Sequence, residues 1–199
     1  MTDDIDLSGA AFGNVDGSGY AGDFINYLDH ATDHFQPVKR FAQSHLRLKP
    51  GERVLDVGCG CGDDVRRMAM SIIPNGCAAG IDVSQSMIEE ARRRCATFVA
   101  PVQFVVAAAE DLPWASAYFD ACLADRVFQH LRNPARALNE MLRVTKLAPR
   151  RAAVREASIG QSPSTLVKRH GSVPRPAPRR RSSRSRNGLG ERWRRCSQS

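Results

Sequence analysis

The chain has 199 residues, of which 42% are hydrophobic and 25% are charged. This composition is typical of a globular domain, and it excludes a wholly disordered, collagen-like or coiled-coil chain. No window is apolar for the ~18 residues that a transmembrane helix needs, so we expect no membrane partner. The acidic N-terminus lacks the basic and then apolar stretch of a secretion signal, and we therefore expect a cytoplasmic protein.

The net charge of +8 is distributed unevenly along the chain. Residues 1–149 carry 15 Lys and Arg against 19 Asp and Glu, which gives this part a net charge of −4. Residues 150–199 carry 14 basic residues against two acidic ones, a net charge of +12. The basic character therefore belongs to the C-terminal segment, and it says nothing about the partner of the preceding residues.

Hydrophobic periodicity predicts alternating strands and helices after a flexible N-terminus over residues 1–23. Residues 24–46 have helical spacing that Pro37 interrupts, which predicts two short helices. The predicted strands that follow are 53–57, 77–81, 102–107 and 119–124. Asp63 and Ser84 are the predicted N-caps of the helices after the first two strands, and Pro134 is the predicted start of the helix after the fourth. This order favours an α/β fold with a doubly wound, Rossmann-like, mostly parallel sheet.

A glycine-rich turn, DVGCGCGD over residues 56–63, joins the first predicted strand to its helix. Glycines suit such a turn because it needs positive φ angles and because a ligand can approach the bare backbone. The GxGxG spacing lacks the Gly-Lys-Ser/Thr of a P-loop and fits the GxGxxG fingerprint poorly. The turn therefore indicates a nucleotide-like ligand, with a purely structural turn as the alternative.

An acidic residue, Asp82, ends the second predicted strand. This is the position at which a carboxylate binds a ribose diol in nucleotide-binding sheets. A helix cap is the alternative role for Asp82, but Ser84 is better placed for it, which leaves Asp82 free for a ligand. Cys59 and Cys61 are not accompanied by the further ligands that tetrahedral zinc requires, so we expect no metal site.

Four segments carry a resemblance to a known family: VLDVGCGCGDD, GIDVSQSMIEEAR, AAAEDLPWASAYFDA and DRVFQHLRNPARALNEMLRVTK. In order and spacing they resemble the motifs of class I S-adenosylmethionine-dependent methyltransferases, especially the small-molecule branch that includes ubiquinone and menaquinone C-methyltransferases. The resemblance covers about residues 50–146. It implies a methyltransferase domain over residues 24–149, S-adenosyl-L-methionine as the cofactor, and a small organic molecule as the methyl acceptor.

The resemblance also implies which residues bind the cofactor. Gly58 and Gly60 would line its methionine moiety, Asp56 would orient the ammonium group, and Asp82 would hold the ribose hydroxyls. The implied contacts to adenine come from a second set of residues, namely Val83, Met87, Ala109 and Glu110. The chain departs from the family beside this set, since Ala108 stands where related sequences have Asp.

Polar residues also follow the fourth predicted strand, at Asp125, Arg126, Gln129 and His130. Residues just beyond the carboxyl ends of parallel strands face the ligand crevice, so Asp125 is a further candidate for cofactor binding. His130 is the candidate general base of catalysis. A structural histidine in a short helix is the alternative, because many methyl transfers need no base.

The resemblance stops after Lys146, where the family continues with Pro-Gly-Gly and an apolar fifth strand. Residues 150–199 contain 13 Arg, 9 Ser and 4 Pro, and this composition predicts a disordered tail without the C-terminal strands. Only AAVRE, over residues 152–156, has the character of a remnant strand. The tail is either an arginine-rich arm that binds phosphates or the product of out-of-frame translation, and we favour the second account.

Two alternative functions follow from that tail. The chain is either a non-catalytic cofactor-binding fragment, or a nucleic-acid methyltransferase that uses its basic segment. The sequence LADRVFQH, after the fourth predicted strand, is not the NPPY-like motif of enzymes that methylate exocyclic amines of bases. Its absence disfavours methylation of exocyclic amines and leaves other nucleic-acid targets open. Between the two kinds of acceptor we expect a small molecule and not nucleic acid.

Overall fold

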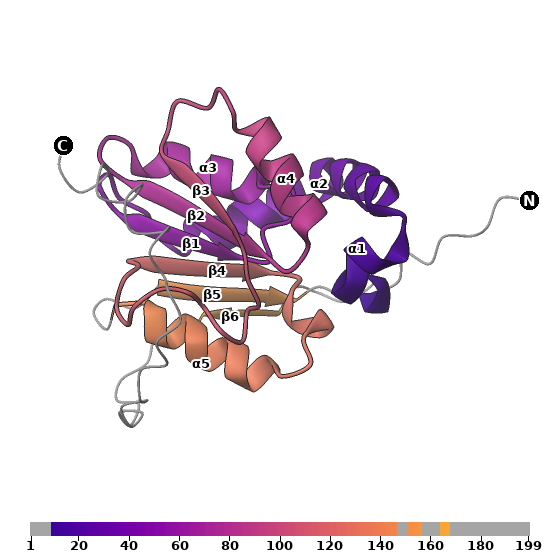
Figure 1. Ribbon diagram of the computed structural model, residues 1–199. Coiled ribbons are helices and arrows are strands. Elements are labelled where there is room, and N and C mark those ends of the chain that lie inside the picture. The colour runs from indigo at the N-terminus through magenta and orange to yellow at the C-terminus, as the bar shows by residue number, and fades with distance from the viewer. Residues whose placement is uncertain (1–8, 147–150, 157–163, 168–199) are drawn as a thin grey trace, which may run out of the picture.

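The computed structural model describes residues 9–146, 151–156 and 164–167, which form a six-stranded sheet with helices on both faces (Figure 1). The strand order is β3-β2-β1-β4-β5-β6. The strands are β1 (Arg53–Val57), β2 (Cys77–Asp82), β3 (Val102–Val106), β4 (Ala121–Asp125), β5 (Arg151–Glu156) and β6 (Ser164–Val167). The first five are parallel and β6 pairs antiparallel with β5, which confirms the predicted α/β class and the mostly parallel sheet.

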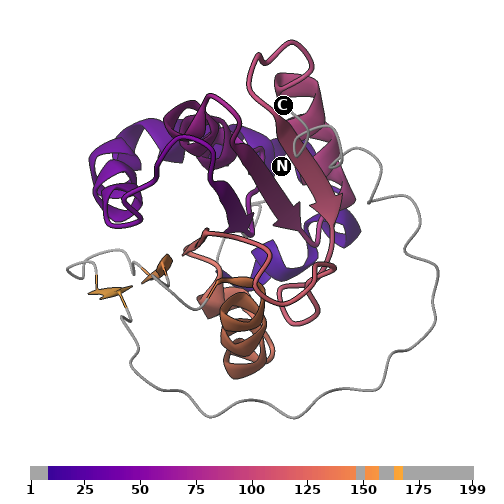
Figure 2. The ribbon, with the colours of Figure 1, turned by 90° about the vertical axis from the view of Figure 1, so that its left-hand side faces the viewer.

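The helical elements precede and separate these strands. They are η1 (Gly9–Asn14), α1 (Val15–Ser18), α2 (Ala21–Ser44), α3 (Asp63–Ile72), α4 (Gln85–Arg94), η2 (Phe128–His130) and α5 (Pro134–Val144). In the turned view of Figure 2, α5 lies below the strands and α3 lies above them. None of the helices in the described ranges is long and apolar enough to cross a membrane.

The core has two layers because successive strand residues point to opposite faces of the sheet. In β1, Val54 belongs to the cluster beneath α3 and α4, whereas Leu55 belongs to the cluster beneath α5. Both side chains are fully buried. The sheet is therefore covered on both faces, as its run of apolar residues requires.

The N-terminal segment differs from the flexible chain that we expected over residues 1–23. Within it, η1 and α1 are helical, and the ring of Phe12 lies 4.9 Å from that of Phe24 in an edge-to-face contact. Residues 1–8 lie outside the described residues. The segment packs because its aromatic and aliphatic side chains, Val15 among them, form a third buried cluster with residues near the glycine turn.

One helix, α2, replaces the two short helices that we predicted on either side of Pro37. Proline can bend a helix without ending it when packing holds both sides. Here Phe24 is buried before the proline, and Ala42 and Leu46 are buried after it. Tertiary packing therefore outweighs the local cost of Pro37.

The C-terminal part also differs from the expectation of missing strands, because β5 extends the sheet beside β4. The small apolar residues of RAAVRE can lie against ACLAD of β4, and Ala153 is 1% exposed. This run is short and shows little alternation, so it gave only a weak strand signal. Residues 157–163 and 168–199, the remainder of the predicted disordered tail, lie outside the described residues.

Candidate functional site

The candidate site lies at the carboxyl ends of β1, β2 and β4, where the strand order changes direction. From β1 the chain proceeds to β2 and β3 on one side, and β4 then pairs with the other side of β1. Ligands of open α/β sheets bind at such a switch point. The loop that leaves β1 there contains Gly58, Gly60 and Gly62, all of which have positive φ.

Position 58 requires glycine for two reasons, its backbone conformation and the close approach of a neighbouring side chain. Its φ is 72°, and a Cβ atom at this position would lie 2.3 Å from Cγ2 of Val127. The turn after β1 and the turn after β4 thus approach each other closely at the switch point. The sequence pattern indicated the glycine, but not that a side chain of the same protein would occupy the space beside it.

Asp82 is positioned by backbone N–H groups from both sides. Its Oδ2 accepts a hydrogen bond from the N–H of Gly60 at 3.0 Å, and its Oδ1 accepts one from Ser84 at 3.0 Å. Burial raises the pKa of this carboxyl above its ordinary value, and the N–H groups partly offset that effect. We had expected the carboxylate of Asp82 to be free for a ligand, but it already accepts two backbone hydrogen bonds. Its oxygens have further lone pairs that a ligand can use.

Ser84 is the helix cap that the sequence predicted. Its Oγ accepts a hydrogen bond from the N–H of Met87, 3.1 Å away, at the start of α4. A second acid, Asp16 of α1, also binds this helix end and accepts hydrogen bonds from the Ser84 hydroxyl and from the N–H groups of Gln85 and Ser86. The N-terminal segment is thereby joined to the element that follows Asp82.

A buried ionic cluster lies on the β1 side of the site. Lys39 of α2 is 8% exposed, and its Nζ lies 2.5 Å from Oδ2 of Asp64 and 3.7 Å from Oδ2 of Asp125. Asp56 is 2% exposed, and burial raises its pKa well above the ordinary value. The neighbouring carboxylates raise this pKa as well, while Lys39 lowers it.

Sequence reasoning missed Lys39 and Asp64. A signal for Lys39 was present, since Phe35, Lys39, Ala42 and Leu46 follow each other at helical spacing, which places a lysine on an otherwise apolar face. A buried lysine is found almost only beside an acidic partner. The partner lies 25 residues later in the chain, and only the fold brings the two together.

The residues that the resemblance assigned to adenine have different surroundings. Val83 is 57% exposed, next to Asp82, whereas Met87 is 2% exposed and its sulfur lies 3.6 Å from that of Cys61. Ala109 is buried, and the half-buried Glu110 accepts a hydrogen bond from Arg136 through its backbone oxygen. The structure thus leaves Val83 accessible and packs Met87 within the N-terminal cluster.

His130 lies in η2 and contacts the N-terminal segment. Its ring centroid is 5.5 Å from that of Phe12, and its Nε2 is 2.9 Å from the side-chain nitrogen of Gln129. Arg126 lies nearby in the chain, and its guanidinium is 4.9 Å from the ring centroid of Phe35 in α2. His130 and Arg126 therefore each contact an aromatic side chain from the N-terminal part of the chain.

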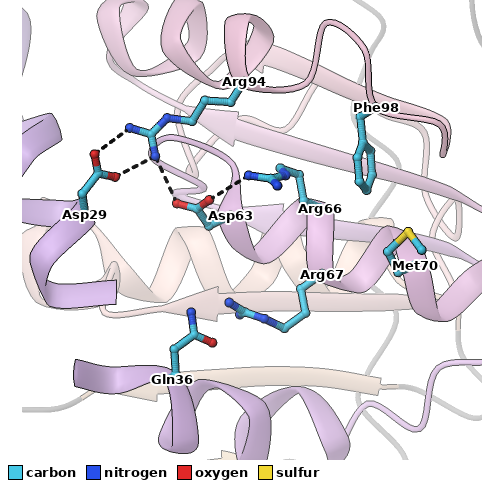
Figure 3. A pocket seen from close by; sticks show the side chains of 8 residues that line it. All are labelled: Asp29, Gln36, Asp63, Arg66, Arg67, Met70, Arg94 and Phe98. Carbon is cyan, nitrogen blue, oxygen red and sulfur yellow. Dashed lines mark hydrogen bonds and ion pairs between the residues drawn. The ribbon is translucent and has the colours of Figure 1, made fainter. Parts of the chain in front are cut away.

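A separate hollow of about 460 Å³ lies between α2, α3 and α4 (Figure 3). It is lined by Asp29, Gln36, Asp63, Arg66, Arg67, Met70, Arg94 and Phe98. Figure 3 shows Arg94 between Asp29 and Asp63, with Nη1 2.7 Å from Oδ1 of Asp29. Because its guanidinium groups are paired with carboxylates, this hollow lacks the unbalanced charge of an anion site.

Comparison with known proteins finds a similarity to one family. Residues 54–147 match the family model described as a methyltransferase domain. Over these residues the chain is similar to class I S-adenosylmethionine-dependent methyltransferases. The matched range begins in β1 and includes the glycine turn, Asp82 and Asp125, so it covers the predicted site.

One curated relative and two solved structures illustrate what the chain is similar to. The ubiquinone/menaquinone biosynthesis C-methyltransferase UbiE of Geotalea uraniireducens is 32% identical over 139 residues, which are 68% of this chain and 58% of the relative. A solved [4+2]-cyclase, SpnF, is 31% identical with a TM-score of 0.53, over 60% of this chain and 44% of its own. A solved S-adenosylmethionine-dependent methyltransferase from Aquifex aeolicus has a TM-score of 0.56 and 23% identity, over 62% of this chain and 66% of its own.

The coverage of the relatives is partial. The chain spans 36% to 58% of the length of the first curated relatives that it matches. The match therefore concerns only a part of each of these proteins.

Proposed function

We propose that this chain binds S-adenosylmethionine and transfers its methyl group to a small organic molecule. The observation that carries the proposal is the carboxylate of Asp82, held at the tip of β2 by the glycine turn and by Ser84. This arrangement presents fixed acceptor oxygens at the switch point of the sheet, where nucleoside ligands bind.

The residues present fit such a ligand. Asp82 would accept hydrogen bonds from the ribose hydroxyls, and Gly58 and Gly60 would line the methionine moiety at a turn without side chains. The buried carboxylate of Asp56 would pair with the ammonium group, and Asp125 would complete this acidic side of the site. Against the adenine, we propose Val83, Met87, Ala109 and Glu110.

When bound, the cofactor supplies a methyl group on a sulfonium centre that is open to in-line displacement. The protein's contribution would be to hold the acceptor in line with that methyl group and to exclude water. His130 is the proposed base for an acceptor that must lose a proton. Phe12 would fix the imidazole ring through the contact between the two rings.

The proposed acceptor class rests on the relatives. UbiE is named for ubiquinone and menaquinone biosynthesis, and both quinones are small organic molecules. The alternative of a non-catalytic cofactor-binding fragment is favoured by the partial coverage, because residues for the acceptor can lie in the unmatched part of the relatives. A cytoplasmic location stays a prediction from the sequence.

Titration calorimetry with S-adenosylmethionine and S-adenosylhomocysteine tests the binding step. Asp82→Ala should weaken binding about 5- to 150-fold, because ribose hydroxyls would be left poorly paired. Asp120→Ala is the matched control, since Asp120 also accepts a backbone N–H, from Arg53, and it precedes β4 at the opposite end of the sheet. A folded wild-type protein that binds neither compound would refute the proposal.

Incubation with radiolabelled S-adenosylmethionine and a cell metabolite extract tests the transfer step. Label in a small organic product supports the proposed enzyme. Cofactor binding without any labelled product supports the non-catalytic fragment. Label found only in RNA, DNA or protein would replace the small-molecule acceptor with a macromolecule.

A further inference from the structure

The buried lysine of α2 is the feature that the family assignment does not explain. Lys39 is 8% exposed and contacts carboxylates from two other elements, Asp64 of α3 and Asp125 of β4. Asp64 also accepts hydrogen bonds from Gln43 at 2.6 Å and from Arg67 at 2.5 Å. A buried ammonium group with this degree of pairing has a defined position.

The charges around Asp56 show how the ammonium group of Lys39 affects its carboxyl group. Asp56 is influenced by three other carboxylates, those of Asp64, Asp125 and Asp82, and by Lys39 as the opposing cation. Arg67 is engaged with Asp64. Arg126, which follows Asp125 in the chain, lies against an aromatic ring of α2.

We propose that Lys39 is a positioning residue of the cofactor site, whose ammonium group balances Asp64 and Asp125 and thereby keeps Asp56 ionised for an incoming ammonium group. The proposal rests on the proposed function, since it names Asp56 as the partner of the cofactor's ammonium. Lys39 itself need not touch the ligand. It acts through the two carboxylates that it contacts.

The direction of the effect follows from the charges. Burial and the neighbouring carboxylates favour the protonated form of Asp56, and a neutral carboxyl cannot pair with an ammonium group. Lys39 lowers the pKa of Asp56. Without Lys39 the pKa of Asp56 rises, so Asp56 becomes ionised only at higher pH. Ligand affinity should then reach its full value only at higher pH.

The test is the pH profile of S-adenosylhomocysteine affinity, measured by calorimetry between pH 5.5 and 9. Lys39→Met should weaken binding most at low pH, approaching about tenfold for each pH unit by which the pKa of Asp56 comes to exceed the pH of the measurement. Binding should then recover as the pH is raised. Lys39→Arg keeps the charge and should restore the wild-type profile, and Arg40→Met removes an exposed charge from the same helix and should leave the profile unchanged.

A profile of Lys39→Met that coincides with that of the wild type would overturn the inference. A uniform loss of affinity at every pH would overturn it as well, because this is what a merely structural lysine predicts. Should Lys39→Met fail to fold, Lys39→Gln serves in its place, because it removes the same charge and keeps a hydrogen-bond donor for Asp64.

A ligand-free measurement separates this inference from the proposed function. Carbon-13 NMR of the aspartate carboxyl groups reports the titration of Asp56 in the free protein. We expect Lys39→Met to raise the midpoint of that titration, and an unchanged midpoint would refute the role of Lys39. If the wild type binds no S-adenosylhomocysteine but the midpoint still moves, the proposed function fails while the charge coupling stands.

Discussion

The two ends of the candidate site hold their carboxylates in different ways. At the amide-held end, formed by Asp82, Gly60 and Ser84, the acid is fixed by backbone N–H groups. At the lysine-held end, formed by Lys39, Asp56, Asp64 and Asp125, the acids are balanced by a side chain from α2. A backbone N–H is lost only when proline replaces the residue, whereas the lysine-held end depends on one side chain that many single substitutions remove.

The largest expected effect lies at the lysine-held end. Asp64→Ala removes the acidic partner of Arg67 and leaves Lys39 with only the longer contact to Asp125, at 3.7 Å. Breaking a buried ion pair in this way costs about 3–5 kcal/mol of unfolding free energy. Urea unfolding at pH 7 measures this change. Asp63→Ala is the control, because Asp63 is half-buried and its two arginine contacts are longer, at 3.4 Å, so we expect a loss of about 1 kcal/mol or less. Equal losses in the two variants would contradict the distinction between the ends.

A somewhat smaller effect is expected where the turns after β1 and β4 meet. Gly58→Ala places a Cβ atom against Val127 at a positive φ, and strain and overpacking together should cost about 2–4 kcal/mol. Gly51→Ala is the matched control, since Gly51 has a φ of 83° but no atom within 4 Å of an added Cβ. This variant should lose only the part of the unfolding free energy that comes from backbone strain. The double variant Gly58→Ala/Val127→Ala should recover part of the loss. No recovery would mean that Val127 does not set the requirement for glycine.

The smallest effect is expected beside the amide-held end, at the N-terminus of α4. Asp16→Ala removes an acceptor of two backbone N–H groups and should cost about 1 kcal/mol in urea unfolding at pH 7. Although slight burial raises the pKa of Asp16, hydrogen bonds from Ser84, Ser86 and Gln85 lower it below its ordinary value. The stabilisation should therefore be complete at neutral pH and disappear as the pH falls below about 3.8. A difference between Asp16→Ala and the wild type that persists undiminished at pH 2 would exclude this carboxylate as its source.

Local sequence patterns predicted the part of the fold that local forces determine. The strand at β1, the glycine turn and the serine cap of α4 each depend on neighbouring residues, and the structure has them where the sequence indicated. The predicted cap of α3 was wrong in detail, since Asp63 is the first helical residue and Gly62, which has no side chain, occupies the N-cap position. The strand β5 was only a weak prediction, because RAAVRE requires β4 as its partner.

Long-range contacts account for what the sequence did not reveal about the site. Asp82 was predicted at the end of β2, but its bond from Gly60 depends on how the turn folds over that strand. Lys39 could not be paired with Asp64 from spacing alone, and the contact of Phe12 with His130 joins residues more than a hundred positions apart. In each case the residue type was visible in the sequence and its partner was not.

The continuity of α2 makes it a mechanical link across the site. At 1.5 Å per residue, the 15 positions from Phe24 to Lys39 correspond to about 22 Å of helix. Phe24 is packed in the N-terminal cluster, and Lys39 is packed among the acids behind the glycine turn. Because a helix is stiff, a displacement of α2 at Phe24 also displaces it at Lys39. The helix therefore couples the position of the N-terminal cluster to the ion pairs of Lys39.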